Sequence, residues 1–179
     1  KFRSAAQKEP GYGLFQFRYA ETLYLLEDSN ALEEARAACE SDPQNPWVWN
    51  LLGLCLEGPE EKADAFEKAH RLEPDLEEPF LNFAEAVCTL GRGEEAEKML
   101  RGRGSAGAWN LLGRLRSDAG LWEEAESFLD RALLLHPNFE DALANMRRPL
   151  WEQGKMGKLE RVLSQLLELR PEEPGYLLD

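Results

Sequence analysis

Two histidines and three cysteines are the side chains of this chain best suited to acid–base, nucleophilic or metal chemistry. His70 and His136 are the only histidines, and no acidic or cysteine partner is placed to make a metal site with them. The cysteines have no CxxC spacing; they are Cys39, Cys55 and Cys88. The two histidines do not support a Ser–His–Asp or Cys–His set. We therefore expect no catalytic residue, no metal ligand and no cofactor, and we interpret the chain as non-enzymatic.

A glycine-rich stretch, Gly102-Arg-Gly-Ser-Ala-Gly107, resembles a phosphate-binding loop. Such a loop follows a strand and ends in Lys-Ser or Lys-Thr, and this stretch has neither feature. Three glycines in six residues are also unfavourable for a helix. We therefore expect no phosphate site here, and we expect Arg101–Gly107 to be non-helical and mobile.

Prolines recur along the chain with the period of a repeat. Their spacings are 33, 31, 63 and 34 residues, at Pro10, Pro43, Pro74, Pro137 and Pro171. The gap of 63 residues corresponds to two periods with one proline missing. Proline cannot continue a helix, and it biases the preceding residue away from helical geometry. A period of about 34 residues indicates a solenoid of stacked units.

The interior of each repeat carries the same residue types. One spacing occurs twice, in Trp49-x-x-Leu52-Gly53 and in Trp109-x-x-Leu112-Gly113. The bulky residue can anchor the first helix of a pair, and the small residue lets the two backbones approach closely. These slots resemble the tetratricopeptide-repeat (TPR) family over nearly the whole chain, most closely in 106–139. The resemblance implies an all-α, right-handed superhelical solenoid of antiparallel helix pairs.

The pattern predicts helix pairs at 12–27 and 31–41, 46–57 and 60–72, 77–90 and 94–101, 106–119 and 122–135, and 140–153 and 158–169. A half-unit at 1–9 and a stub at 172–179 flank them. We interpret 1–179 as one array excised from a larger protein, with units 1–10 (partial), 11–43, 44–74, 75–104, 105–137, 138–171 and 172–179 (partial). Pro149 lies inside a predicted first helix, so we expect a kink near 145–148.

The formal net charge of −13 reflects a large excess of carboxylates. They lie mostly in second helices and their flanking turns, such as 57–67 and 94–97, which we interpret as a solvated outer face. The acidic balance argues against non-specific nucleic-acid binding and against docking on an anionic membrane. No apolar run approaches the roughly 20 residues of a membrane span. The cysteines are expected to be buried free thiols, which favours a reducing compartment such as the cytoplasm.

The first helices of such a superhelix line its inner groove, and side chains opposite the packing face point inward. The groove residues predicted in this way are Phe17, Glu21, Tyr24, Trp47, Asn50, Asn82, Glu85, Asn110, Arg114, Asn145, Arg148 and Trp151. Four of these are asparagines, whose amides can both donate to and accept from a peptide backbone. The resemblance to the TPR family implies that these asparagines bind the backbone of a peptide in this way. Two alternative interpretations stay open. The asparagines could simply be the residue type that suits this position of the repeat, without a role in binding, and Trp47 and Trp151 could pack between units instead of facing the groove.

The chain lacks the cation pattern of one TPR subtype. Co-chaperone members clamp a C-terminal carboxylate with Lys, Asn and Arg on consecutive first helices, whereas Phe17 and Glu21 stand at the first of these positions. The sequence therefore favours a non-catalytic scaffold that holds another protein or peptide in its groove. Two other functions stay open: the substrate-selecting or regulatory arm of an enzyme whose catalytic domain lies outside this chain, and a scaffold that self-associates through open repeat ends.

Overall fold

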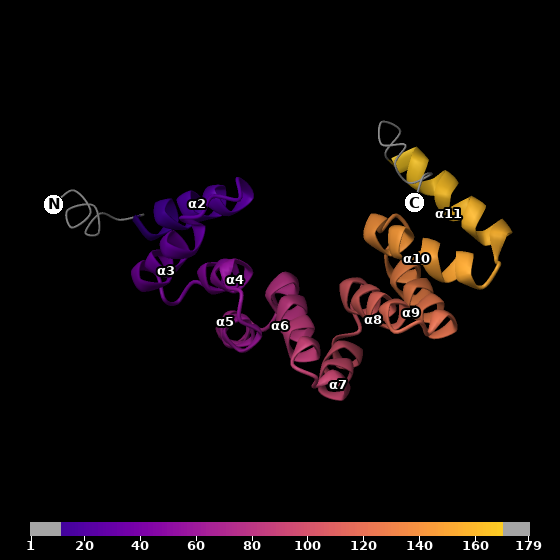
Figure 1. The fold of residues 1–179 in the computed structure, drawn as a ribbon, viewed down its shortest axis with the longest axis horizontal. Coiled ribbons are helices and arrows are strands. Elements are labelled where there is room, and N and C mark those ends of the chain that lie inside the picture. The colour runs from indigo at the N-terminus through magenta and orange to yellow at the C-terminus, as the bar shows by residue number, and fades with distance from the viewer. Residues whose placement is uncertain (1–11, 170–179) are drawn as a thin grey trace. The chain divides into compact units, whose positions relative to one another are not determined.

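The chain is helical throughout the part that the structure describes. This computed structural model describes residues 12–169, and no strand occurs in that range. The helices are α2 (Tyr12–Leu25), α3 (Ala31–Ser41), α4 (Pro46–Cys55), α5 (Pro59–Leu72), α6 (Glu77–Thr89), α7 (Gly93–Arg103), α8 (Ala106–Asp118), α9 (Trp122–Leu135), α10 (Glu140–Glu152) and α11 (Met156–Leu169) (Figure 1). The predicted all-α class is confirmed. The half-unit at 1–9 and the stub at 172–179 lie outside the described residues.

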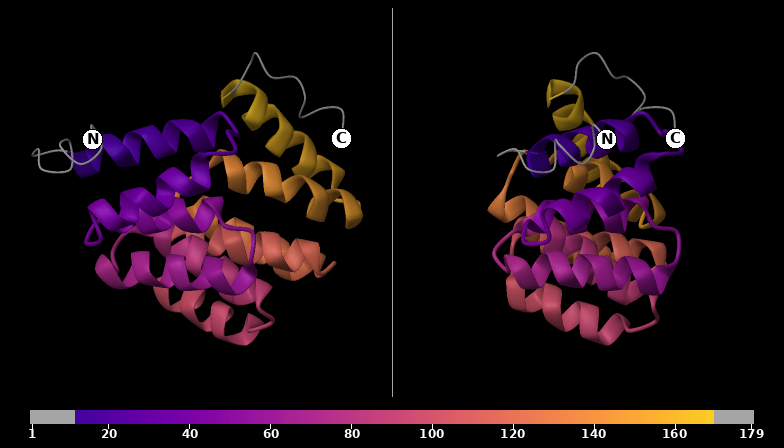
Figure 2. Two further views of the ribbon diagram at one scale, coloured as in Figure 1. Left: turned by 60° about the vertical axis from the view of Figure 1, so that its left-hand side comes forward. Right: turned by 90° about the vertical axis from the view of Figure 1, so that its left-hand side faces the viewer.

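The chain divides into two compact units, 1–96 and 97–179. The first contains α2 to α6, the second contains α8 to α11, and α7 crosses the boundary between them. Within the units, α2 packs on α3, α4 on α5, α8 on α9 and α10 on α11. The left view of Figure 2 shows α2 beside α3 and α10 beside α11. Helix pairs are therefore the building blocks of each unit, while one array over 1–179 stays a prediction.

Residues with left-handed backbone end the first helix of three pairs, at Gly91 (φ 77°), Gly120 (φ 74°) and Gly154 (φ 67°). The following amide then bonds back to the last turn; Leu121 N, for example, donates to Arg116 O at 2.9 Å. Glycine adopts this conformation without steric cost. In the turn between α2 and α3, Glu27 has the same conformation at φ 54°, at a cost of about 1 kcal/mol.

The small-residue slot brings the two helices of a pair into contact. A Cβ atom on Gly53 of α4 would lie 2.5 Å from Cε1 of Phe66 on α5. A Cβ atom on Gly113 of α8 would lie 2.5 Å from Cγ of Leu129 on α9. Real Cβ atoms do not approach a neighbour so closely, so these helices can pack at this distance because glycine has no side chain.

The bulky slot ties each first helix to its surroundings. The indole Nε1 of Trp49 donates to Pro43 O at 2.9 Å, which holds the turn before α4. Trp109 stacks on Phe128 of α9 with ring centroids 5.8 Å apart. Both tryptophans therefore serve as packing anchors, as the repeat pattern predicted.

The glycine-rich stretch is helical over most of its length, against expectation. α7 ends at Arg103 and α8 begins at Ala106, so only Gly104 and Ser105 lie outside a helix. Gly104 has a left-handed backbone conformation at φ 65°. Ser105 caps α8, because its Oγ accepts a hydrogen bond from Ala108 N at 3.1 Å. The prediction that Arg101–Gly107 is non-helical is wrong at 101–103 and 106–107.

Side-chain contacts outweigh the helix cost of Gly102, which is about 1 kcal/mol. Leu100 is fully buried, and its burial contributes about 2 kcal/mol. The Arg101 guanidinium lies 4.8 Å from the centroid of the Phe128 ring and donates to Glu97 at 2.8 Å. These contacts hold the last turn of α7 in place although its intrinsic propensity is poor.

Pro149 is accommodated inside α10, which continues to Glu152. Pro149 is buried, and Met146 and Leu150 beside it are fully buried. Burial of these neighbouring side chains offsets the roughly 3 kcal/mol that an interior proline costs. The kink near 145–148 stays a prediction.

Candidate partner-binding face

Asn50 of α4 is a buried amide that joins two first helices. Its side chain is 3% exposed. Its Nδ2 donates to Glu78 Oε1 at 3.0 Å, and its Oδ1 accepts from Asn82 Nδ2 at 2.9 Å. Both partners lie on α6. Asn50 was expected to present its amide to a ligand, whereas the structure engages this amide within the unit.

A second amide pair joins α8 and α10. Asn145 Nδ2 donates to Asn110 Oδ1 at 2.9 Å, and both side chains are half-buried. In each pair, the first asparagine directly follows the bulky residue of its repeat, Trp49 or Trp109. The second asparagine lies two residues after the bulky residue of the next first helix, which is Phe80 or Leu143. This offset of one residue recurs in both units and brings the amides within hydrogen-bond distance.

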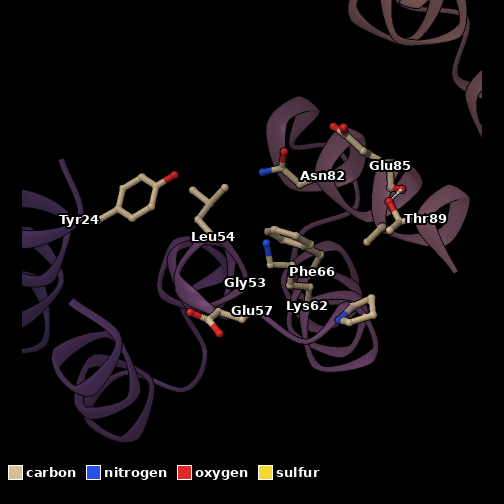
Figure 3. A pocket seen from close by; sticks show the side chains of 11 residues that line it. Tyr24, Gly53, Leu54, Glu57, Lys62, Phe66, Asn82, Glu85 and Thr89 are labelled. Carbon is tan, nitrogen blue, oxygen red and sulfur yellow. Dashed lines mark hydrogen bonds between the residues drawn. The ribbon is translucent and has the colours of Figure 1, made fainter. Parts of the chain in front are cut away.

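A hollow of about 480 Å³ opens on the first unit. Its lining comes from α2, α4, α5, α6 and the turn after α4: Tyr24, Gly53, Leu54, Glu57, Pro59, Lys62, Phe66, Asn82, Glu85, Ala86 and Thr89 (Figure 3). We call it the Tyr24 hollow. It contains the predicted groove residues Tyr24, Asn82 and Glu85. Sequence reasoning missed Phe66 and Lys62, because they belong to a second helix and only first helices were expected to line the groove.

A second hollow, of about 640 Å³, adjoins the first and shares Tyr24, Leu54 and Glu57 with it. Its other charged lining residues are Glu27, Asp28, Arg36 and Glu61. Glu27 and Asp28 lie in the turn between α2 and α3, Arg36 lies in the middle of α3, and Glu61 lies near the start of α5. The two hollows are therefore neighbours that share part of their lining.

Three predicted groove residues near the start of the chain lie in different environments. Phe17 is 8% exposed and packs in the core of the first unit, so its assignment to the groove surface is wrong. Glu21 is half-buried and accepts a hydrogen bond from Arg18 at 2.7 Å. Trp47 is exposed near the start of α4. Phe17 and Glu21 lie on the same side of α2, four residues apart, but Phe17 belongs to the buried face of the helix and Glu21 lies at the edge of that face.

The predicted groove residues of the second unit include two exposed side chains. Trp151 is 64% exposed. Arg148 is also exposed, and its guanidinium lies 5.2 Å from the centroid of the Trp122 ring. Arg114 is half-buried and lies 3.7 Å from a carboxylate oxygen of Asp118. The arginines are therefore already engaged with neighbours of their own unit.

The negative charge is concentrated in one of the two units. Residues 12–96 contain 19 Asp and Glu against six Lys and Arg, whereas residues 97–169 contain 11 of each kind. The first unit is thus strongly acidic and the described part of the second is neutral. The negative charge therefore differs between the two halves of the chain, and this difference is not an alternation between first and second helices.

Some outer carboxylates are engaged in ion pairs. Glu97 on α7 accepts from Arg101 at 2.8 Å and is paired with Arg116 on α8. The hydrogen bond from Arg101, together with the one from Arg116, holds the pKa of Glu97 below its ordinary value. Glu97 therefore stabilises contacts of the second unit, and the interpretation of 94–97 as a merely solvated face is incomplete.

Cys39 is buried as expected, whereas Cys55 and Cys88 are half-buried and His136 is exposed. Cys39 is buried and its Sγ donates to Val48 O at 3.3 Å, and burial raises the pKa of this thiol to about 12. The His70 ring lies 5.4 Å from that of Phe80. In residues 12–169, no three His, Cys, Asp or Glu side chains group together as metal ligands would, and no helix has the length and apolarity to cross a membrane.

Asn50→Ala is expected to lower the free energy of unfolding by about 2 kcal/mol, because it removes the two hydrogen bonds that this buried amide makes to α6, one of them to the carboxylate of Glu78. Urea unfolding followed by circular dichroism measures this change. Asn145→Ala is the matched control, since its amide is only half-buried, and its cost should stay below about 1 kcal/mol. Equal stability of Asn50→Ala and the unmodified chain would show that the buried amide is not structural.

Comparison with known proteins identifies the repeat and the fold. Residues 108–143 match the family model described as tetratricopeptide repeat. Among solved structures, TTC0263, a thermophilic TPR protein in Thermus thermophilus, aligns with a TM-score of 0.75 at 18% identity, over 93% of this chain and 95% of that chain. PilW, a type IV pilus biogenesis factor, aligns with a TM-score of 0.69 at 20% identity, over 89% of this chain and 78% of that chain. YrrB, a TPR protein with an unusual peptide-binding site, aligns with a TM-score of 0.53 at 20% identity, over 90% and 88% of the two chains. A comparison with curated protein sequences gives no match.

Proposed function

Since residues 108–143 are a tetratricopeptide repeat and the chain has the fold of TPR proteins, we propose that it is a non-catalytic scaffold that binds a segment of a partner protein on its first helices. In the first unit these helices are α2, α4 and α6, which all contribute to the lining of the Tyr24 hollow. In the second unit they are α8 and α10. Because a fold alone does not define a function, the proposal depends on the side chains that these helices present.

The amide pairs carry the proposal. The bond between Asn145 and Asn110 uses one N–H group of the first and one lone pair of the second. An amide side chain has two N–H groups and two acceptor lone pairs, so this bond occupies less than half of what either amide offers. Both side chains are half-buried on adjacent first helices. They are suited to meet the alternating N–H and C=O groups of an extended peptide.

The chemistry of these groups favours a peptide over other partners. Amides bind a backbone whatever its side chains are, whereas the Tyr24 hollow offers space for one side chain of a bound segment. YrrB, which shares the fold, is described as a TPR protein with an unusual peptide-binding site. That description supports a peptide as the class of partner by analogy of fold.

The proposal is tested by selecting short random peptides displayed on phage against the purified chain. The tightest peptide is then mapped by backbone amide chemical shifts. We expect the largest shifts on first helices, at or beside Asn82, Asn110 or Asn145, because those helices would contact the peptide. Asp64 of α5 and Ser127 of α9, both exposed on second helices, serve as controls. Shifts confined to second helices, or the absence of any selected peptide, would contradict the proposal.

A further inference from the structure

The Tyr24 hollow combines an apolar floor with a charged rim. Leu54 and Phe66 contribute apolar surface from α4 and α5. Tyr24 reaches in from α2 with its hydroxyl directed toward Leu54 (Figure 3). Glu57, in the turn after α4, and Glu85, on α6, stand on opposite sides of this floor. A side chain that enters here meets hydrocarbon first and carboxylates at the edge.

Carboxylates outnumber cations around the Tyr24 hollow and the adjoining one. The acidic lining residues of the two are Glu27, Asp28, Glu57, Glu61 and Glu85, against Arg36 and Lys62. Lys62 and Arg36 reduce this excess without reversing it. The hollow also belongs to the acidic unit, in which 19 Asp and Glu face six Lys and Arg. Both the local lining and the surrounding field are therefore negative.

We propose that the Tyr24 hollow receives a lysine or arginine side chain from an extended segment of the partner protein. The inference rests on the proposed function, because it specifies one residue of the bound segment. The aliphatic stem of the incoming residue lies on Leu54 and Phe66, as long cationic side chains commonly do on apolar surface. Its charged head reaches Glu57 or Glu85, where a charge-assisted hydrogen bond can form.

Other occupants fit the hollow less well. An apolar side chain would remove water from the rim carboxylates and bring no hydrogen-bond donor in its place, which is unfavourable. An acidic side chain would meet charges of its own sign. A metal ion would need several clustered ligands, and no three His, Cys, Asp or Glu side chains form such a group in residues 12–169. The aliphatic stem and single positive charge of lysine or arginine match both the floor and the rim.

The test compares peptide selection on the unmodified chain with selection on Glu57→Gln/Glu85→Gln. We expect selected peptides to be enriched in lysine or arginine at one position, and the double substitution to abolish that enrichment. The matched control is Glu40→Gln/Asp64→Asn, which removes two charges from exposed positions of the same unit outside both hollows. This control should keep the enrichment. Circular dichroism and the melting temperature check that each variant remains folded.

A reciprocal measurement tests whether the peptide's cation meets these carboxylates. The tightest selected peptide is labelled with fluorescein, and a second version carries norleucine in place of its enriched lysine or arginine. We expect the replacement to weaken binding to the unmodified chain about tenfold or more. The same replacement should have little effect on binding to Glu57→Gln/Glu85→Gln, because the partner charges are gone.

Each outcome separates this inference from the proposed function. Enrichment that depends on Glu57 and Glu85, with the reciprocal loss, supports the inference. Selected peptides without a basic preference, or a preference that persists in Glu57→Gln/Glu85→Gln, overturn the inference and leave peptide binding standing. Failure to select any peptide overturns the proposed function and the inference with it.

Discussion

Gly113→Val is expected to lower the free energy of unfolding by about 3 kcal/mol, because it forces side-chain atoms into a closed helix contact. Even a Cβ atom at this position would lie 2.5 Å from Cγ and 2.8 Å from Cδ2 of Leu129, and 3.2 Å from the carbonyl oxygen of Ala125. Leu129 is fully buried and cannot move aside into solvent. Valine gains only a few tenths of a kcal/mol of helix propensity over glycine, so the steric effect dominates. Urea unfolding followed by circular dichroism measures the loss.

Two controls separate this clash from a general effect of substituting glycine. Gly102 is also helical, and no other described residue lies within 4 Å of a Cβ built on it, so Gly102→Ala should raise the free energy of unfolding by about 0.5–1 kcal/mol. Leu129→Ala removes the clashing atoms, so combining it with Gly113→Val should cost less than the sum of the two single changes. Full additivity would show that the two residues do not clash.

Glu126→Gln is expected to lower the free energy of unfolding at neutral pH by about 3 kcal/mol. Glu126 of α9 is 9% exposed and accepts hydrogen bonds from Gln153 at 2.9 Å, Lys155 at 2.6 Å and Lys158 at 2.9 Å. Burial alone would raise the pKa of Glu126, but these hydrogen bonds outweigh it and lower the pKa from 4.5 to about 2. The carboxylate thereby ties α9 to α11 and to the turn before it.

The effect of Glu126→Gln should depend on pH in a defined direction. The folded pKa lies below the unfolded one, so the stabilisation is fully present above about pH 5 and is lost as the pH falls toward 2. Urea unfolding at several pH values should therefore show the difference between the two chains shrinking over this range. Glu160→Gln, at an exposed position on α11, should give no such trend. A difference that persists unchanged at low pH would show that the ionised form of Glu126 is not what stabilises the unit.

Helix bounds could be predicted from the sequence where the deciding signals are local. α3 and α9 have the predicted bounds, 31–41 and 122–135, because a proline follows each helix within a few residues. The end of α7 could not be predicted in this way. Intrinsic propensity disfavours a helix at Gly102, and the contact of Arg101 with the Phe128 ring depends on packing against α9.

The candidate site was predictable in its helices but not in its contacts. Tyr24, Asn82 and Glu85 were assigned to one face of the first helices and line one hollow, although binding of a partner there stays a prediction. Asn50 was expected on the same face, yet Glu78 and Asn82 enclose its amide. Sequence spacing shows which residues share a side of a helix, but it does not show which polar groups from the next helix will reach them.

The carboxylate excess of residues 12–96 bears on how fast a basic partner arrives as well as on how it is held. Electrostatic attraction acts over about 10 Å at 0.1 M salt and about 30 Å at 0.01 M salt, so the acidic unit would draw the proposed cationic segment inward before any side chains touch. Lower ionic strength should therefore raise the association rate constant steeply. The lifetime of the proposed complex would depend instead on short-range contacts in the hollow, which salt screens far less. For this chain, ionic strength would set the rate of encounter far more than the residence time of the bound segment.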